Sequence, residues 1–323
     1  MIGVGSQTSN VDRSDSLIYS NAVQIDASND DVHQDDGTDI GTLMGTGSWT
    51  YIWWTKVITP GNWINVYQTH WAKGDNTFSG NNYIRFSVGS NESEEVLLTE
   101  FFHPGDVSPN QKRAAPWWYL QCQSGGSPIQ LKSFTPTALG SPIRGSDLNN
   151  MNGSLPGGAA YAPHPTSGFT CFALTCDASG TNRDFKLYIN GVEIPGSSGS
   201  DISSGRGYAE TTLASSTNFE SHVGSATFNL HKNMNLFASV YPVVAGPQAF
   251  WDSVLTQAEI KEIFYSHPTL TSNFGDYTSS GDLQRWYKFD EGTGTSVADS
   301  SGNSGQAFDL VNGPTWVKEN IVT

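Results

Sequence analysis

The chain has 323 residues, enough for one large all-β domain with long loops or for two small domains. Its 31 Asp and Glu residues outnumber its 16 Lys and Arg residues, and the formal net charge of −15 argues against nucleic acid as a partner. No stretch is apolar for long enough to span a bilayer, so no membrane insertion is expected. The 34 glycines and 15 prolines divide the chain at the short intervals typical of a β-sandwich or barrel.

The cysteines and the N-terminus predict where the protein is made. Cys122, Cys171 and Cys176 are too few, and odd in number, for a disulfide framework, which favours a reducing compartment. Residues 1–17 are small and polar, and we interpret them as an arm that becomes ordered on a neighbour. This start has neither the basic flank nor the apolar core of a signal peptide, so ordinary secretion is not predicted.

The first predicted elements contain an acidic segment. Residues 22–26 alternate like a strand, residues 29–31 predict a turn, and residues 48–57 predict a long aromatic strand. Clustered Asp and Asn side chains supply the hard oxygen ligands that calcium takes, so calcium is the expected cofactor if there is one. The alternative is that these acids form turns through their own backbone hydrogen bonds. The candidate ligands are Asp30, Asp31, Asp36 and, in the tail, Asp299.

Tryptophan pairs mark possible ligand-binding positions. In Trp53-Trp54 and Trp117-Trp118, neighbours on a strand point to opposite faces, so each pair is expected to send one indole outward. An outward indole suits stacking on a sugar ring, or packing against a loop or another subunit. The candidates for ligand binding are Trp54, Trp118 and Trp63.

The middle of the chain offers no convincing catalytic group. Residues 82–88 and 117–122 have strand character, and we interpret the Pro- and Gly-rich residues 132–167 as an insertion. Retaining glycosidases on a related sheet need two carboxylates about 5–5.5 Å apart. The nearest candidate, residues 92–96, ends in Val96 where the acid should be, which favours a solvated acidic loop. No zinc spacing and no nucleophile elbow occurs, and we predict no catalytic residues.

The second half contains the clearest local patterns. Residues 169–176, 184–189 and 192–194 predict a meander of three strands, with Asn190-Gly191 as its second turn. Cys171 and Cys176 lie five residues apart on one of these strands, so they face opposite sides and do not bridge. Residues 253–265 predict a helix in which Thr256 and Glu259 form a capping box.

Three of these segments resemble the laminin-G-like branch of the concanavalin A-like jelly rolls. They are residues 169–194, residues 249–260 and the tail at 283–316, which resembles the start of such a domain rather than its end. The resemblance implies an all-β, two-sheet antiparallel jelly-roll sandwich with one short helix over residues 18–323. We predict that the tail, 283–316, folds back beside the N-terminal strand and completes the sandwich.

These expectations combine into two functional hypotheses. The first is a non-enzymatic structural or attachment protein on a virion surface, made in a host cytoplasm and contacting other virion proteins, further copies of itself or a cell-surface glycan. The alternative is an extracellular carbohydrate-binding lectin module or glycoside hydrolase of the same fold. A weaker third possibility is a fragment of a cell-surface adhesin.

Overall fold

The computed structural model describes residues 21–26, 30–34, 38–45, 47–57, 67–74, 83–89, 113–114, 117–123, 129–134, 143–144, 169–194, 212–216, 228–230, 243–266 and 269–319. The N-terminal arm predicted for residues 1–17 lies outside them. So do residues 58–66 and 92–96.

Two eight-stranded sheets form the body of the protein, and every strand pair is antiparallel. Sheet A has the order β12 (Val192–Ile194), β11 (Asp184–Ile189), β10 (Thr170–Asp177), β3 (Trp49–Val57), β14 (Val243–Trp251), β1 (Asn21–Ile25) and β18 (Thr315–Lys318), with β15 (Leu283–Tyr287) also paired to β14.

Sheet B has the order β16 (Ser296–Val297), β17 (Phe308–Val311), β2 (Asp31–Gln34), β13 (Phe228–Leu230), β4 (Tyr67–Gly74), β5 (Tyr83–Gly89), β7 (Trp117–Gln123) and β8 (Ile129–Phe134). A small third sheet pairs β6 (Arg113–Ala114) with β9 (Ile143–Arg144). The predicted all-β, two-sheet class is therefore confirmed. Besides the predicted helix, which is α4 (Gln257–Ser266), there is a second short helix, α1 (Thr38–Met44).

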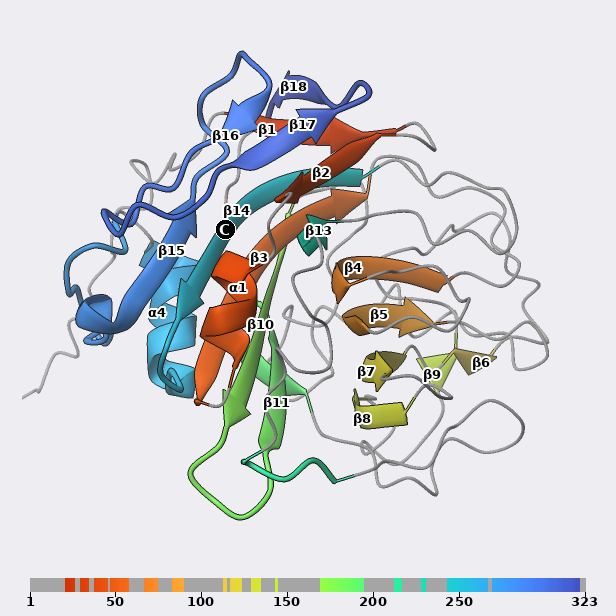
Figure 1. The fold of residues 1–323 in the computed structure, drawn as a ribbon, viewed down its shortest axis with the longest axis vertical. Helices are drawn as coiled ribbons and strands as arrows, with labels where there is room; N and C mark the ends of the chain where they lie inside the picture. Colours follow the sequence, from red (N-terminus) through yellow and green to blue (C-terminus); the bar gives the residue numbers. More distant parts are fainter. Residues whose placement is uncertain are drawn as a thin grey trace, which may run out of the picture.

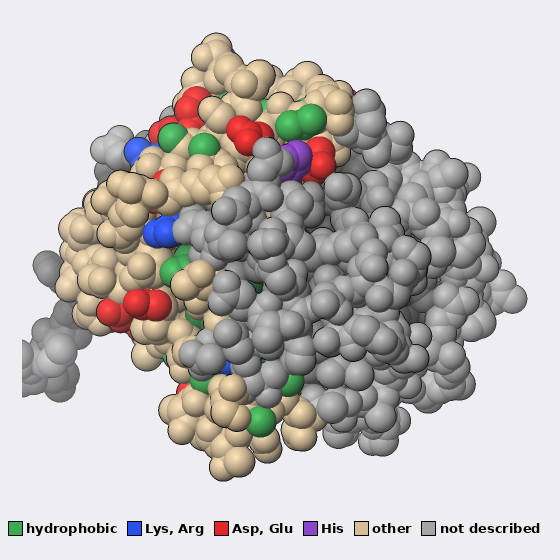
Figure 2. Space-filling view, in the orientation of Figure 1, with side chains coloured by type: hydrophobic (Ala, Val, Ile, Leu, Met, Phe, Trp, Pro, Cys, Tyr) green, Lys and Arg blue, Asp and Glu red, His purple; other side chains and the backbone are tan. Residues whose placement is uncertain are grey.

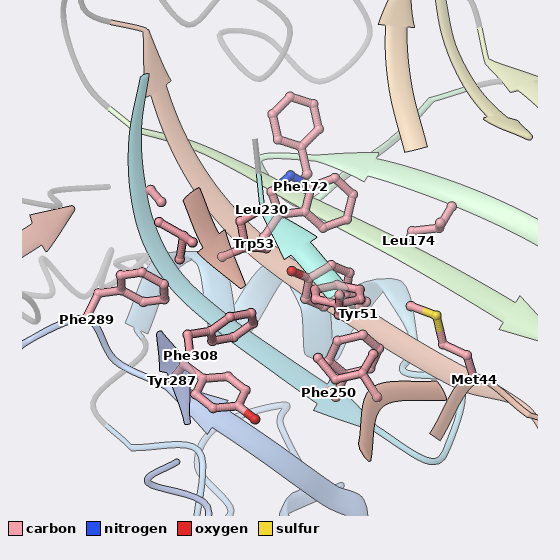
Figure 3. Close-up of a cluster of buried hydrophobic side chains, with 14 of the residues drawn as sticks. Met44, Tyr51, Trp53, Phe172, Leu174, Leu230, Phe250, Tyr287, Phe289 and Phe308 are labelled. Carbon is pink, nitrogen blue, oxygen red and sulfur yellow. The ribbon is translucent and has the colours of Figure 1, made fainter. Parts of the chain in front are cut away.

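Aromatic side chains fill the space between the two sheets (Figure 3). On sheet A, Phe250 stacks on Tyr51 with ring centroids 4.1 Å apart, and Trp53 stacks on Phe172 at 5.4 Å. Phe228 of sheet B meets the Tyr51 ring edge-on at 6.0 Å. Each such pair contributes about 0.5–1.5 kcal/mol beyond the burial of its apolar area, so this layer is a major source of stability.

The meander and the helix support each other. Asn190 and Gly191 have φ values of 50° and 79°, the left-handed pair that a type I′ turn requires, as the sequence predicted. Asn190 Oδ1 accepts a hydrogen bond from the Cys171 backbone N–H at 2.9 Å. A Cβ at position 191 would lie 3.1 Å from Lys261 Cα, so glycine is needed both for its φ and for the close approach of α4.

The tail lies in the same sheet as the N-terminal strand (Figure 1). β18 pairs with β1, placing Trp316 opposite Val23, and β15 pairs with the second half of β14. β17 pairs with β2 in sheet B, so the tail contributes strands to both sheets. The extent of the domain, 18–323, stays a prediction.

Two segments differ from the sequence-based expectation. Residues 29–31 were expected to form a turn, yet Asp31 begins strand β2 because Val32 and Gln34 alternate into the core. Residues 132–167 were interpreted as an insertion without strands, but β8 extends to residue 134 and β9 pairs with β6.

The capping box of α4 is confirmed, and it also ties the helix to the following loop. The Thr256 backbone N–H donates to Glu259 Oε2 at 2.9 Å, and the Glu259 N–H donates to Thr256 Oγ1 at 3.2 Å. Glu259 Oε1 accepts hydrogen bonds from the Thr278 N–H at 3.2 Å and from Ser279 Oγ at 2.6 Å. Burial raises the pKa of Glu259, but these hydrogen bonds outweigh burial and hold the pKa below its ordinary value of 4.5.

We predict that Glu259→Gln lowers the free energy of unfolding at pH 7 by about 2 kcal/mol, the scale of hydrogen bonds to a charged group. A carboxylate with a lowered pKa in the folded state stabilises the fold above the unfolded pKa. That stability is lost as the pH falls through the folded value. Urea unfolding should therefore show the difference shrinking below pH 4.5. Glu262→Gln on the same helix is the control, and an equal loss there would contradict the assignment.

Candidate functional site

Both faces of sheet A are covered by other elements of the protein, and this determines the burial of Trp54. Trp53 lies in the core between the sheets, whereas Trp54 lies in a second buried cluster with Ile260 and Ile263 of α4. Trp54 is 1% exposed. The expectation that Trp54 stacks on a ligand is therefore wrong, and its alternative, packing, is what the structure shows. A ring at this depth presents no face to a sugar.

Asp299, one of the predicted metal ligands, organises a loop instead. Its Oδ1 accepts from the backbone N–H groups of Trp286 and Ser301, each at 2.9 Å, and its Oδ2 accepts from the Gly305 N–H at 2.8 Å. The bonds from Ser301 and Gly305 lie in the turn that follows, the alternative role weighed for acidic residues in this chain, and the bond from Trp286 ties this turn to β15.

The acidic residues of the first segment are also engaged in structure. Asp30 is 5% exposed and its Oδ2 accepts from the Asp26 backbone N–H at 3.0 Å. Asp31 Oδ2 lies 3.0 Å from His33 Nδ1. Asp36 lies outside the described residues, and among those described no three His, Cys, Asp or Glu side chains gather as a metal site would need. Calcium as a cofactor stays a prediction.

Cys171 and Cys176 are free and lie in different buried clusters, so the prediction that they do not bridge is confirmed. Burial raises the pKa of the Cys171 thiol well above its ordinary value, and it raises that of Cys176 to about 11. Both thiols are therefore protonated near neutral pH and poor nucleophiles.

The outer face of sheet B is the face turned away from the core. Its position is fixed by β2, β13 and β17, because Val32, Leu230 and Phe308 are buried in the core between the sheets. On the same strands Asp31, His33 and Asp309 alternate with buried residues and are only partly buried. Acidic side chains gather on the upper part of the described surface, over β1, β2 and β17 (Figures 1 and 2).

Strand pairing continues sheet B from β13 through four further strands, β4, β5, β7 and β8. Residues directly opposite each other in an antiparallel pair share a face. Starting from His33, the register therefore defines one row that crosses seven strands and spans about 29 Å at the usual spacing between strands. We call it the polar row, and its members are Asp309, His33, Asn229, Ala72, Arg85, Gln121 and Gln130.

The same register separates Trp117 from Trp118. Trp118 pairs with Val88 of β5 and with Phe134 of β8, and Trp117 pairs with Gly89 of β5. The prediction that Trp118 binds a ligand stays a prediction. Trp63 and the acidic residues 92–96 lie outside the described residues.

The strands that extend sheet B contain both polar and aromatic residues. β7 alternates Trp117, Tyr119 and Gln121 with Trp118, Leu120 and Cys122, and it pairs with β5 and with β8.

Comparisons of the sequence with protein-family models and with curated proteins give no match. Among solved structures, a heptameric SAP-like pentraxin from Limulus polyphemus is 8% identical, with a TM-score of 0.43 and coverage of 95% of this chain and 98% of that chain. A putative carbohydrate binding protein from Bacteroides ovatus is 14% identical, with a TM-score of 0.42. The alignment covers 93% of this chain, which spans 60% of the length of that protein.

A tailspike protein from an Escherichia coli bacteriophage is 9% identical, with a TM-score of 0.40 and coverage of 83% of this chain and 26% of that chain. Similarity at this level carries no argument about function. The fold class is assigned from the pairing of the strands. Among the described residues, no helix is long and apolar enough to cross a membrane.

We predict that Trp54→Ala lowers the free energy of unfolding by about 4 kcal/mol, since it leaves a large cavity under α4. Trp54→Phe, which keeps an aromatic ring there, should cost less. Urea denaturation monitored by circular dichroism distinguishes a packing role of Trp54 from a ligand-binding role. An alanine variant of unchanged stability would show that the indole is not a packing element.

Proposed function

We propose that this protein is a non-enzymatic carbohydrate-binding module, built on a laminin-G-like sandwich, that serves on a virion as an attachment or capsid-decorating protein. The proposal is supported by the composition and pairing of the strands that extend sheet B. β7 carries Trp117, Trp118 and Tyr119 and pairs with β5, while both faces of sheet A are used for packing.

The chemistry of these positions suits sugars. A pyranose ring has a face of C–H groups that packs on an aromatic plane and a rim of hydroxyl groups that exchange hydrogen bonds. Trp and Tyr provide large amphipathic surfaces, and the Gln amides both donate and accept. These residues lie on two paired strands of one sheet, which favours a ligand of several sugar units over a single sugar.

The virion setting is supported by the cysteines and by the sheet edges. Two buried, reduced thiols suit a protein that folds in a reducing cytoplasm, where virion proteins are made. Among the described strands, β18 and β8 each stand at the end of a sheet, and an edge strand offers backbone groups with which a neighbouring chain can pair. We propose that neighbouring virion proteins, or further copies of this chain, are its protein partners.

A glycan array probed with the whole chain tests the binding function. Trp117→Ala should weaken binding to the best glycan about tenfold, since loss of one aromatic contact costs about 1.4 kcal/mol. Its melting temperature should stay close to that of the wild type.

Trp54→Ala is the matched control, because it removes the same side chain from a position that is 1% exposed. It should destabilise the fold. No binding by the wild-type chain to any glycan would refute the function, and unchanged binding in Trp117→Ala would refute the role of Trp117. Release of reducing sugar from a bound polysaccharide would show a glycosidase instead, and immunogold labelling of purified particles tests the virion setting.

A further inference from the structure

Asparagine loses its side-chain amide most easily where glycine follows it. The backbone nitrogen of the glycine attacks the side-chain carbonyl of the asparagine, and glycine has no Cβ to hinder that approach. The sequence has three such dipeptides, Asn152-Gly153, Asn190-Gly191 and Asn312-Gly313. The structure describes the second and the third of them, and it places them in different surroundings.

Asn190 is held inside the meander. Its side chain is buried, and its Oδ1 accepts a hydrogen bond from the Cys171 N–H at 2.9 Å. Its own backbone N–H donates to the Cys171 carbonyl at 2.8 Å. Asn190 must break both hydrogen bonds before its side chain can turn toward the following nitrogen, so the fold protects this dipeptide.

Asn312 lies in the turn between β17 and β18 and has no such protection. Asn312 and Gly313 are both exposed, with φ values of 66° and 129°. Within the part of the chain that the structure describes, neither the Asn312 side chain nor the Gly313 N–H has a hydrogen-bond partner. The carbonyl carbon that is attacked and the nitrogen that attacks it are therefore both open to solvent.

We propose that Asn312 is a site of spontaneous deamidation, with water as the co-reactant. The Gly313 nitrogen forms a bond to Asn312 Cγ and loses its proton, while the side-chain amide leaves as ammonia. Water then opens the succinimide ring at either of its carbonyl carbons. One product is aspartate. In the other, isoaspartate, the backbone runs through the former side chain and the α-carboxylate is left free.

Both products are expected to weaken the connection between the two sheets. Only residues 312–314 join β17 in sheet B to β18 in sheet A. A Cβ at position 313 would lie 3.1 Å from Asp30 Oδ1, so this turn already passes close to a carboxyl group that is 5% exposed. Deamidation adds a second negative charge to the turn, and isoaspartate also lengthens its backbone by one carbon atom. Both changes oppose the pairing of β18 with β1.

The test is peptide mapping by mass spectrometry of the whole chain after ageing at mildly alkaline pH, which promotes loss of the Gly313 proton. We expect the peptide that contains Asn312 to deamidate about thirtyfold faster than the peptide that contains Asn190, the ratio that two hydrogen bonds support. Enzymatic methylation of isoaspartate should label the same peptide. In urea the two peptides should react at similar rates, because neither is then protected by the fold.

Melting temperatures test the effect on the sheets. The aged wild-type chain should melt about 2 °C below the fresh chain, the shift that one lost interaction causes in a domain of this size. Asn312→Gly is the matched variant, because glycine accepts the φ of 66° without strain and has no amide to lose. It should melt at the same temperature before and after ageing. Asn312→Asp adds the charge without the longer backbone and should reproduce only part of the shift.

The outcomes bear separately on the site and on its effect, and neither depends on carbohydrate binding. Equal rates for the two peptides in the folded chain, or faster reaction at Asn190, would overturn the assignment of Asn312. An aged wild-type chain that melts with the fresh one, or an equal fall in aged Asn312→Gly, would overturn the weakening of β18.

Discussion

The rest of the fold depends on β14, because this strand is hydrogen-bonded to other strands along both of its edges. All nine of its residues are buried. One edge pairs with β3. The other is shared, with β1 on residues 243–245 and β15 on residues 248–251. Gly246 and Pro247 stand at the division, where proline has no N–H to leave unpaired. The β-bulge at this point shifts by one residue the alternation of side chains between the two faces of the sheet. Ala245 and Phe250, five residues apart, therefore both face the main core.

Because β14 and β3 are packed on both faces, sheet A serves as the frame of the fold. β3 and β10 are hydrogen-bonded neighbours, yet the chain between them builds β4, β5, β7 and β8. In Figure 1 these strands stand apart from the blue C-terminal strands. Buried Arg183 strengthens the frame beside the α1 end of β3, because its guanidinium donates to the Gly45 and Gly47 carbonyls at 2.7 and 3.0 Å. The proposed binding surface is thus an insertion carried by a rigid sandwich.

Local chemistry made parts of this structure predictable from the sequence, whereas pairing between distant segments did not. The Asn190-Gly191 turn and the Thr256–Glu259 capping box depend on a few consecutive residues, and both are confirmed. Period-two alternation predicts that Trp117 and Trp118 lie on opposite faces, but it does not predict that β7 pairs with β5. Alternation also made Trp54 a candidate for ligand binding, because the sequence does not show that α4 packs over this side chain.

The pairing of β1 with β18 determines how this protein bears a load. Asn21, at the start of β1, lies opposite Lys318, at the end of β18, so the chain enters and leaves the fold side by side. A force pulling the two termini apart opens this ladder one rung at a time, the weakest way to strain a sheet. Tension between one terminus and the far strands of sheet B instead crosses the whole sandwich. A tether that holds a particle to a surface is mechanically robust only along that second path.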